Sequence, residues 1–361
     1  MRMTNHWKVP PAVGPEDPGI LEAARLIRAG GLVAFPTETV YGLGADARST
    51  AAVEGIFEAK GRPSDNPLIV HIAQREQVDE LTEGADELSR RLMDAFWPGP
   101  LTLVLPVKPG AVSPRVTAGL ATVGVRMPDH PAALALIAAA GCPVAAPSAN
   151  RSGRPSPTTA EHVLADLAGR IAGVVDAGPT GVGVESTVVE VAGGDVHVLR
   201  PGGVTAAQLR TVVPRVSAPH EDAADGGSPA AAAEEPDHAP KAPGMKYTHY
   251  APQGRLTLVD GDPERTAAWI REELRRAKAA GERTGVLAFD EHLALYDADV
   301  VLSCGSRERP EEAARRLYAA LRTFDEEGAT FLLAEAPDSQ GLGSAVLNRL
   351  IKAAGHRLVQ V

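Results

Sequence analysis

The sequence predicts an α/β fold in two domains joined by a linker. Short apolar runs typical of buried strands alternate with segments of helical spacing over residues 15–212, and again over residues 253–361. Between them, residues 217–241 contain no Val, Ile, Leu, Met or aromatic residue. Such a segment cannot bury enough apolar surface to fold, so we expect it to be the disordered part of a linker that spans residues 213–252.

The composition is that of an ordinary globular protein and excludes several classes. Of the 361 residues, 44% are hydrophobic and 23% are charged. The two cysteines, Cys142 and Cys304, lie far apart, which indicates neither a disulfide framework nor a zinc site. The N-terminus carries no apolar signal segment, and no run approaches the roughly 18 apolar residues of a membrane helix. We therefore expect a cytoplasmic protein.

The net charge is −10, and the linker supplies half of it. Residues 217–241 hold six acids against one lysine, so the folded parts are closer to neutral than the total indicates. An acidic chain argues against broad, nonspecific binding of nucleic acid, although a local basic groove is compatible with it.

The first domain opens with a helix, a strand and a polar loop. Apolar residues recur at helical spacing over Ile20–Ala29, and a glycine pair ends this helix. Leu32–Phe35 is then a short strand. Pro36–Gly44 follows, with three hydroxyl groups, a carboxylate and two glycines. Such a segment lets the backbone approach a small ligand, but it is equally compatible with a glycine-rich loop that binds nothing.

A cationic turn precedes the next strand. A helix over Ser49–Lys60 delivers Lys60 and Arg62 to a turn made by glycine and proline. Leu68–Ile72 is then predicted to be a buried strand that carries His71. Cationic groups at a strand end are suited to holding an anion, although a Lys-Gly-Arg turn is often only a solvated surface turn.

The next strand pair contains an arginine in an apolar setting. Ala85–Phe96 has helical spacing, the prolines at 98 and 100 end that helix, and Leu101–Val107 is an apolar run. Arg126 then lies in the strand-like stretch Thr122–Pro128. An unpaired buried charge is strongly unfavourable, so Arg126 needs a partner. The partner is either an internal carboxylate or a carboxylate of the substrate.

Three later segments again place small polar or cationic residues beside strands. A helix over Ala132–Ala140 leads to the strand Pro143–Ala146 and then to Pro-Ser-Ala-Asn at 147–150, which suits phosphate or base contacts or an ordinary helix cap. Ser186 begins another strand, and Arg200 precedes a proline and two glycines. The recurrence of this pattern in five segments favours one shared pocket over five unrelated turns.

The second domain alternates regularly between strands and helices, which predicts a small Rossmann-like unit of three layers. Strands are expected over Leu256–Val259, Val286–Phe289, Val300–Leu302, Thr330–Leu333 and Arg357–Val361, and helices over Pro263–Ala280, Pro310–Phe324 and Ala345–Ala354. Gly341-Leu-Gly343 is too weak to predict a nucleotide site, because it lacks a third glycine and does not directly follow a strand.

Eight motifs, in order, carry a resemblance to a known family. They are PTETVYGLG (36–44), KGRPSDNPLIVHI (60–72), WPGPLT (97–102), VGVRMPDHP (123–131), PSAN (147–150), GVESTVV (183–189), LRPGG (199–203) and PGMKYTHYAP (243–252). With these motifs the chain resembles the long, two-domain form of the YrdC-like threonylcarbamoyl-AMP synthases. The resemblance implies a twisted, largely open α/β sheet with a central basic cleft, followed by the Rossmann-like domain.

The resemblance also implies a reaction and a set of binding residues. The reaction joins L-threonine, bicarbonate or CO2, and ATP into threonylcarbamoyl-adenylate and pyrophosphate, the first step of t6A formation at position 37 of tRNAs. The implied ATP side comprises Lys60, Arg62, Asn66, Thr122, Ser148, Asn150, Ser156, Arg200 and, in the linker, Tyr247, and the implied threonine side comprises Thr39, His71, Arg126, Ala146 and Ser186. Lys60 and Arg62 are the catalytic candidates.

Some assignments have alternatives. His71 is either a ligand of threonine or a satisfied core histidine, and Tyr250 is the second choice after Tyr247 for the ATP contact. We expect residues 243–252, an aromatic and basic island, to dock as a lid. Arg126 would pair the threonine carboxylate as a fork. No residue stands out as a general base.

The implied cofactor is Mg2+ carried on the ATP phosphates, with no metal ligands from protein side chains. The chain has no Walker-type phosphate loop, so side chains and loop amides must hold the phosphates. The product would be handed to a threonylcarbamoyl-transferase complex, with weak or indirect binding of tRNA and no membrane partner. A related carbamoyl-adenylate-forming maturation factor is excluded, because it needs cysteine-rich zinc modules. The remaining alternative is a module that binds tRNA or double-stranded RNA in the same cleft.

Overall fold

The computed structural model describes residues 3–218 and 249–361, which form two compact units. Among these residues, the first unit holds 3–152 and 156–218, and the second holds 153–155 and 249–361. Tyr247 and nearly all of the expected disordered segment lie outside the described residues. No helix in the described part is long and apolar enough to cross a membrane.

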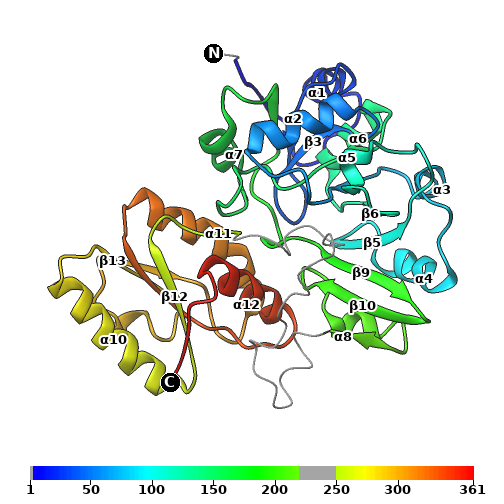
Figure 1. Cartoon of the computed structure of the whole chain (residues 1–361). Helices are drawn as coiled ribbons and strands as arrows, with labels where there is room; N and C mark the ends of the chain where they lie inside the picture. The colour runs from blue at the N-terminus through cyan, green and yellow to red at the C-terminus, as the bar shows by residue number, and fades with distance from the viewer. Residues whose placement is uncertain (1–2, 219–248) are drawn as a thin grey trace. The chain divides into compact units, whose positions relative to one another are not determined.

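The first unit is built on one large mixed sheet with helices on its faces (Figure 1). The strand order is β1-β8-β2-β3-β7-β4-β6-β5-β9-β10-β11. The strands are β1 (Asn5–Lys8), β2 (Val33–Phe35), β3 (Gly42–Asp46), β4 (Ile69–His71), β5 (Leu101–Pro106), β6 (Thr122–Arg126), β7 (Val144–Ala145), β8 (Gly173–Asp176), β9 (Thr187–Ala192), β10 (Asp195–Arg200) and β11 (Val216–Ser217).

The helices of this unit begin and end where the sequence supplies caps. They are α1 (Pro18–Arg28), α2 (Thr50–Lys60), α3 (Gln77–Leu81), α4 (Glu87–Phe96), α5 (Pro114–Thr117), α6 (Pro131–Ala140), α7 (Ala160–Leu167) and α8 (Ala206–Arg210). In α2, the side chain of Ser49 caps the first turn, and Gly61 ends the helix in the left-handed conformation, with φ 62°. The last helical residue is therefore Lys60, held at the mouth of the turn that leads to β4.

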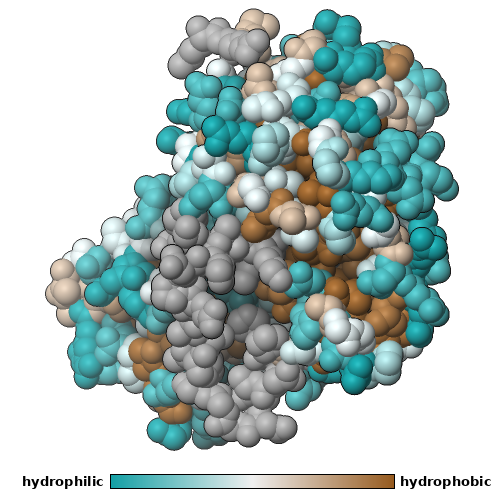
Figure 2. Space-filling model, turned by 45° about the vertical axis from the view of Figure 1, so that its right-hand side comes forward, coloured by the Kyte–Doolittle hydropathy of each residue, from teal (hydrophilic) through white to brown (hydrophobic). Residues whose placement is uncertain are grey.

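Two apolar cores lie on opposite faces of the sheet. Along β2, Val33 and Phe35 belong to one core and Ala34 to the other, as the alternation of side chains in a strand requires. The first core includes α1 and α6, and the second includes α2, α4 and α7. Over the visible surface, hydrophilic side chains predominate, with smaller apolar areas between them (Figure 2).

The predicted elements of this unit are confirmed, with two corrections and several additions. Gly42–Gly44 was expected to belong to a loop, but it lies in β3, antiparallel to β2. The glycines permit this close packing, since a Cβ on Gly44 would lie 2.7 Å from the ring of Phe35. The short helices α3, α5, α7 and α8 and the strands β1, β8 and β11 were not predicted, and β11 corrects the start of the expected linker, because it pairs with β10. β1 precedes the expected domain start at residue 15, and it pairs with β8 at the sheet edge.

The second unit is a parallel sheet between two helical layers, as predicted. Its strand order is β14-β13-β15-β12-β16, and every pairing is parallel. Figure 1 shows α10 on one face and α11 and α12 on the other. The elements are β12 (Arg255–Asp260), α10 (Pro263–Ala279), β13 (Thr284–Ala288), the 3-10 helix η3 (Leu293–Leu295), β14 (Val300–Ser303), α11 (Pro310–Glu326), β15 (Phe331–Glu335), α12 (Leu342–Ala353) and β16 (Leu358–Gln360).

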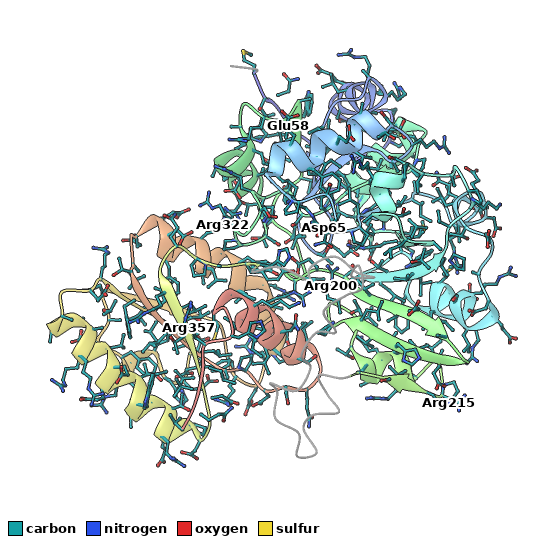
Figure 3. All side chains as sticks on the ribbon, in the orientation of Figure 1. Glu58, Asp65, Arg200, Arg215, Arg322 and Arg357 are labelled. Carbon is teal, nitrogen blue, oxygen red and sulfur yellow. The ribbon has the colours of Figure 1, made fainter. Side chains whose placement is uncertain are left out.

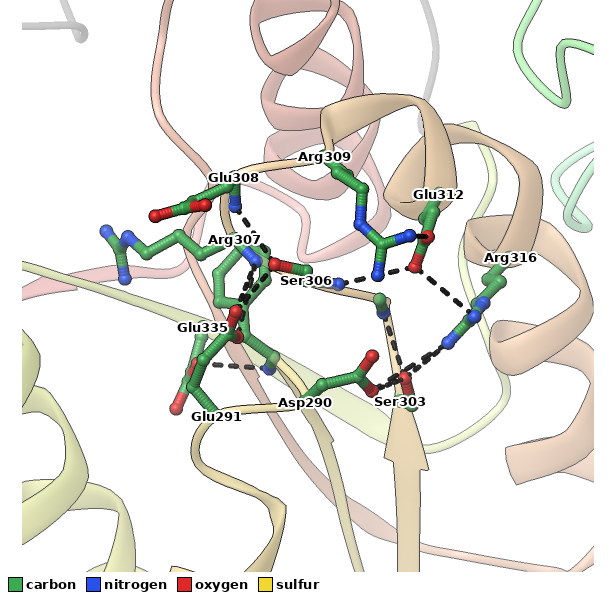
Figure 4. A network of polar contacts seen from close by, with 12 residues as sticks. Asp290, Glu291, Ser303, Ser306, Arg307, Glu308, Arg309, Glu312, Arg316 and Glu335 are labelled. Atoms are coloured by element: carbon green, nitrogen blue, oxygen red, sulfur yellow. Dashed lines mark hydrogen bonds and ion pairs between the residues drawn. The ribbon is translucent and has the colours of Figure 1, made fainter.

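A network of polar contacts joins the carboxyl ends of β13, β14 and β15 (Figure 4). Glu335 ends β15 with a buried carboxylate that accepts a hydrogen bond from Phe289 N at 3.2 Å and contacts His292 Nδ1 at 2.9 Å. Beside it, Ser303 donates a hydrogen bond to Asp290. These donors and acceptors satisfy one another, and so they fix the strand ends where α/β sheets commonly bind ligands.

Candidate functional site

Four of the predicted site residues meet at one edge of the large sheet. His71 ends β4 and stands opposite Arg126, which ends the parallel strand β6. β5 runs antiparallel to β6 and parallel to β9, so the starts of β5 and β9 lie at this same edge. Ser186 directly precedes β9, and Arg200, labelled in Figure 3, ends β10 beside it. The mixed sheet thus brings together residues that are far apart in the sequence.

Arg126 is buried and its partner is an internal carboxylate. Its Nη2 lies 2.6 Å from Glu38 Oε1, and the two side chains are 4% and 12% exposed. Its Nη1 donates to Thr39 Oγ1 at 3.0 Å and its Nε to Gly99 O at 3.3 Å. Within the chain itself, the partner of Arg126 is therefore the internal carboxylate of Glu38. Thr39, a predicted threonine-side residue, lies against the same guanidinium.

His71 is a buried, neutral histidine. Burial, and to a smaller extent the charge of Arg126, lower the pKa of His71 to about 3. Its Nδ1 lies 3.3 Å from Ile69 O, and the ring meets that of Phe35 edge to face. Ala146, the neighbouring threonine-side residue, donates its N–H to Ile69 O at 2.9 Å. At neutral pH His71 therefore adds hydrogen-bonding capacity but no charge to this edge.

Ser186 joins the two predicted sides of the site. Arg200 Nη2 donates to Ser186 O at 2.9 Å and to Ser186 Oγ at 3.2 Å. Thr102 Oγ1 shares a hydrogen bond of 2.8 Å with Ser186 Oγ. Next to it, Ser156 Oγ donates to Glu185 Oε1 at 2.6 Å. Two residues assigned to ATP therefore lie close to the threonine-side serine: Arg200 contacts Ser186 itself, and Ser156 contacts its neighbour in the chain, Glu185.

Lys60 is 3% exposed and is held against the segment that follows β7. Its Nζ donates to Asn150 O at 2.6 Å and to Ser148 O at 2.5 Å. Its own carbonyl accepts from Ser152 N at 2.9 Å. The contacts place Lys60, Ser148 and Asn150 together, as predicted, and they give the ammonium group a structural role in holding that segment.

Asn66 is fully buried and has no internal hydrogen bond. Neither its Nδ2 nor its Oδ1 has a partner among the described residues. Nearby, Arg62 Nη2 approaches Pro67 O at 3.4 Å. Thr122 begins β6 two residues before Gly124, which stands opposite Ile69. Asn66 and Thr122 therefore lie at the opposite sheet edge from Arg126, on the side of Lys60.

The loop before β3 connects the two groups of residues. Tyr41 O accepts from Ala149 N at 2.8 Å, and Gly42 bridges to Ser148. At the other end of the loop, Thr39 O accepts from Gly183 N at 3.1 Å and its hydroxyl meets Arg126. The expectation that this polar loop borders a site is consistent with its position between both groups.

Three neighbours of the site were not singled out from the sequence. They are Glu38, Thr102 and Glu185. Glu38 and Glu185 each lie in a motif that was noted, but a carboxylate in a loop carries no sign of which distant cation or hydroxyl it will meet. Thr102 also lies in a motif that was noted, WPGPLT, but a threonine near the start of a strand does not indicate that it will meet Ser186.

Tyr250, the alternative to Tyr247, is engaged within the second unit. Its ring packs on Tyr318 with centroids 5.3 Å apart, and the guanidinium of Arg349 lies 5.7 Å from its ring centroid. The side chain is buried and its φ is 67°, an unusual value for a residue with a side chain. The second unit thereby anchors the end of the linker motif.

The described residues contain no group of three or more His, Cys, Asp or Glu side chains that could hold a metal ion. Near the predicted ATP residues, Glu185 is a buried carboxylate that accepts a hydrogen bond from Ser156. Mg2+ bound to a nucleotide needs only one or two carboxylates, because phosphates and waters fill its other positions. A single carboxylate such as that of Glu185 therefore fits a Mg2+ ion that enters the site bound to the nucleotide.

Known proteins resemble the chain over its whole length. The model of the Sua5, YciO and YrdC family, described as telomere recombination, matches residues 25–202. The model described as threonylcarbamoyl-AMP synthase, C-terminal domain, matches residues 204–355. A threonylcarbamoyl-AMP synthase of Bacillus subtilis is 52% identical over 99% of both chains, and one of Pyrococcus abyssi is 47% identical over 94% of this chain and 95% of that one.

A solved structure is similar in fold as well as in sequence. The crystal structure of P. abyssi Sua5 complexed with L-threonine matches with a TM-score of 0.89 and 45% identity, covering 99% of this chain and all of that one.

Proposed function

The chain belongs to the family of two-domain threonylcarbamoyl-AMP synthases, and we propose that its first unit carries out that reaction. It is a nucleotidyltransferase that makes L-threonylcarbamoyl-adenylate from L-threonine, bicarbonate or CO2, and ATP, and releases pyrophosphate. The product serves t6A formation in tRNA. The full-length relatives are named as synthases, so we do not propose the alternative of an RNA-binding module.

The observation that carries the proposal is the pair of residue groups linked by the loop before β3. At one edge, buried Arg126 and neutral His71 lie beside Thr39 and Ser186, a set that suits a small polar amino acid. At the other edge, the fully buried amide of Asn66 has both a donor and an acceptor without an internal partner. A buried amide of this kind is unfavourable unless a ligand satisfies it.

We assign the two substrates to these two groups. The nucleotide binds to Lys60, Arg62, Asn66, Thr122, Ser148, Asn150, Ser156 and Arg200, and threonine binds to Thr39, His71, Arg126, Ala146 and Ser186. The hydrogen bonds of Arg200 to Ser186 support a junction at which the two substrates adjoin. The carbamate of threonine attacks the α-phosphate there, and because both reactants are anions, the protein contributes chiefly positioning and charge neutralisation. We place no general base.

Mg2+ is part of the proposal as a companion of ATP. It would neutralise phosphate charge, and Glu185, which accepts a hydrogen bond from the proposed nucleotide residue Ser156, is a carboxylate that could share in holding it. Lys60 and Arg200 would supply the remaining neutralisation from the protein.

The partner that follows in the proposal is a threonylcarbamoyl-transferase complex that takes over the labile adenylate. Binding of tRNA by this chain would be weak or indirect, since the chain is acidic. Because ATP, threonine and tRNA are cytoplasmic, we place the enzyme in that compartment.

Release of pyrophosphate tests the proposed reaction. We expect release only when ATP, L-threonine, bicarbonate and Mg2+ are present together. Omitting each component in turn should reduce release to background. Full release in the absence of threonine would contradict the proposal and would indicate an ATP hydrolase.

A further inference from the structure

We infer that Glu38 and Arg126 together form a receptor for the zwitterion of the amino-acid substrate, with Glu38 binding its ammonium group. The inference rests on the proposed function and adds to it a specificity-determining residue. Arg126 is already assigned to the carboxylate of threonine. The ammonium group of threonine, which is bonded to the same carbon atom as the carboxylate, then needs a partner of its own.

Glu38 has the charge, the burial and the unused hydrogen-bonding capacity that this role requires. Its side chain is 12% exposed, and Oε1 lies 2.6 Å from Arg126 Nη2. The contact does not have the geometry of a hydrogen bond, and both carboxylate oxygens and Arg126 Nη2 lack a hydrogen-bond partner in the described part of the chain. A buried carboxylate in this state can accept several N–H donors from a ligand.

Hydrogen bonds hold the backbone on both sides of the Glu38 side chain. Its carbonyl accepts from Val182 N at 2.7 Å. Before it, Thr37 Oγ1 shares a hydrogen bond of 2.8 Å with Thr39 Oγ1 and donates to Val40 O at 2.7 Å. Thr39 in turn receives Arg126 Nη1. One connected set of hydrogen bonds therefore joins the segment that carries Glu38 to the guanidinium of Arg126, while the Glu38 carboxylate itself remains available to a ligand.

The chemistry of an α-amino acid explains why both charges are needed. Its carboxylate and ammonium groups are bonded to one carbon, so neither enters a buried site without the other. A site with Arg126 alone would desolvate the ammonium group without a partner, which is strongly unfavourable. The adjacent His71 is neutral, so it neither repels the ammonium nor replaces Glu38. A zwitterion placed between Glu38 and Arg126 exchanges one internal ion pair for two ion pairs with the ligand.

A different role for Glu38 predicts the opposite change in threonine affinity when the charge of Glu38 is removed. If Glu38 only neutralises Arg126 in the empty site, it competes with the threonine carboxylate, and removing its charge strengthens threonine binding. If Glu38 binds the ammonium group, removing its charge weakens threonine binding. A ligand that keeps the carboxylate but lacks the ammonium group distinguishes these two roles of Glu38.

The test is calorimetric binding of L-threonine and of 2,3-dihydroxybutanoate, which has a hydroxyl in place of the ammonium group. For Glu38→Gln we expect threonine to bind roughly 10- to 100-fold more weakly, the range for loss of a charge-assisted contact, and the analogue to bind no more weakly than before. The control is Glu54→Gln, which removes a half-exposed carboxylate paired with Arg115 at the surface and should change neither affinity. Threonine binding as tight as in the wild type would overturn the inference.

Glu38→Gln also leaves a buried guanidinium without its counter-charge, which lowers stability. The wild-type chain therefore gives a second test: threonine should bind at least about tenfold more tightly than the analogue, and equal affinities would overturn the inference. A wild-type chain that binds neither ligand contradicts the proposed function as well, whereas threonine binding that survives Glu38→Gln overturns this inference alone.

Discussion

At the scale of single residues, the proposed site contains buried polar side chains that the protein itself leaves without hydrogen bonds. Many other buried polar atoms have partners: Thr187 Oγ1 donates to Val204 O, and Tyr41 OH donates to Gly178 O at 2.7 Å. In the proposed site, Asn66 and Glu38 are buried without a hydrogen bond to their side chains in the described residues. Such groups reduce stability in the empty protein and gain partners from a ligand.

Asn66→Ala should therefore separate stability from binding. The unsatisfied amide costs roughly 1–3 kcal/mol, so we expect its removal to leave the free energy of unfolding unchanged or to raise it. We expect the affinity for ATP to fall by about tenfold or more, because the amide would otherwise bond the nucleotide. Urea unfolding and equilibrium binding of ATP measure the two effects.

Ser89→Ala is the matched control for Asn66→Ala. Ser89 is 1% exposed on α4, and its Oγ also lacks a hydrogen-bond partner, but it lies outside the proposed site. It should preserve stability and leave ATP affinity unchanged. Equal ATP affinity in the wild type and Asn66→Ala would remove Asn66 from the nucleotide site.

His71 predicts how stability depends on pH. Its pKa is about 3 in the folded protein and 6.5 in the unfolded chain, so between these values only the unfolded state takes up the proton. The free energy of unfolding should thus fall as the pH is lowered through this window, by about 2 kcal/mol from His71 between pH 7.5 and pH 5. The pKa of His130 is also lowered, chiefly by burial, and adds in the same direction.

The measurement is urea unfolding of the wild type and of His71→Gln at several pH values. The variant should lose the share of the pH dependence that belongs to His71 and retain that of His130. The same pH dependence in both proteins would mean that His71 is protonated in the folded state near its ordinary pKa.

At the scale of elements, the sheet order decides which residues meet. Helix α2 could be predicted to its last residue because Ser49 and Gly61 mark its ends. The pairing of Glu38 with Arg126 could not be predicted, because it depends on which strands are neighbours and on their direction. Apolar runs reveal where strands lie, and they do not reveal that β6 lies between β4 and β5. Short elements such as α5 and β8 have too few residues to show a period.

One glycine at this scale holds two segments of the site together. A Cβ on Gly202 would lie 2.3 Å from Glu185 O and 2.4 Å from Thr187 N, both of them backbone atoms. Gly202→Ala must displace the segment that carries Ser186, so we expect it to lower the free energy of unfolding by about 1–3 kcal/mol and to reduce threonine binding. Thermal unfolding and threonine titration measure both.

Gly55→Ala provides the comparison. Its nearest neighbour would be Leu32 Cδ1 at 3.6 Å, an ordinary contact, and it lies within α2. Alanine is favoured over glycine in a helix by roughly 1 kcal/mol, so this variant should be as stable as the wild type or more stable. If Gly202→Ala behaved like Gly55→Ala, close packing of residues 185–187 against Gly202 would not be needed.

At the scale of the whole molecule, each unit has an apolar core of its own. Leu136 on α6 is fully buried in a core of the first unit, and Leu274 on α10 is 1% exposed in the core of the second. Because Leu136 and Leu274 belong to separate core clusters, one in each unit, we expect two separable unfolding transitions in calorimetry. Leu→Ala at a buried site costs about 2–5 kcal/mol.

Leu136→Ala should therefore lower the midpoint of one transition and Leu274→Ala that of the other. Each variant serves as the control for its counterpart. If either substitution lowered both midpoints equally, the two units would unfold as one cooperative body.

The chemical identity of the product tests the proposed function most directly. The purified chain is incubated with ATP, Mg2+, L-threonine and 13C-labelled bicarbonate, and the products are separated quickly and analysed by mass spectrometry. We expect an adenylate that contains threonine and one labelled carbon, formed together with pyrophosphate and absent when threonine is replaced by 2,3-dihydroxybutanoate. An unlabelled adenylate of threonine, or ADP and phosphate with no adenylate, would contradict the assignment of this chain as a threonylcarbamoyl-adenylate synthase.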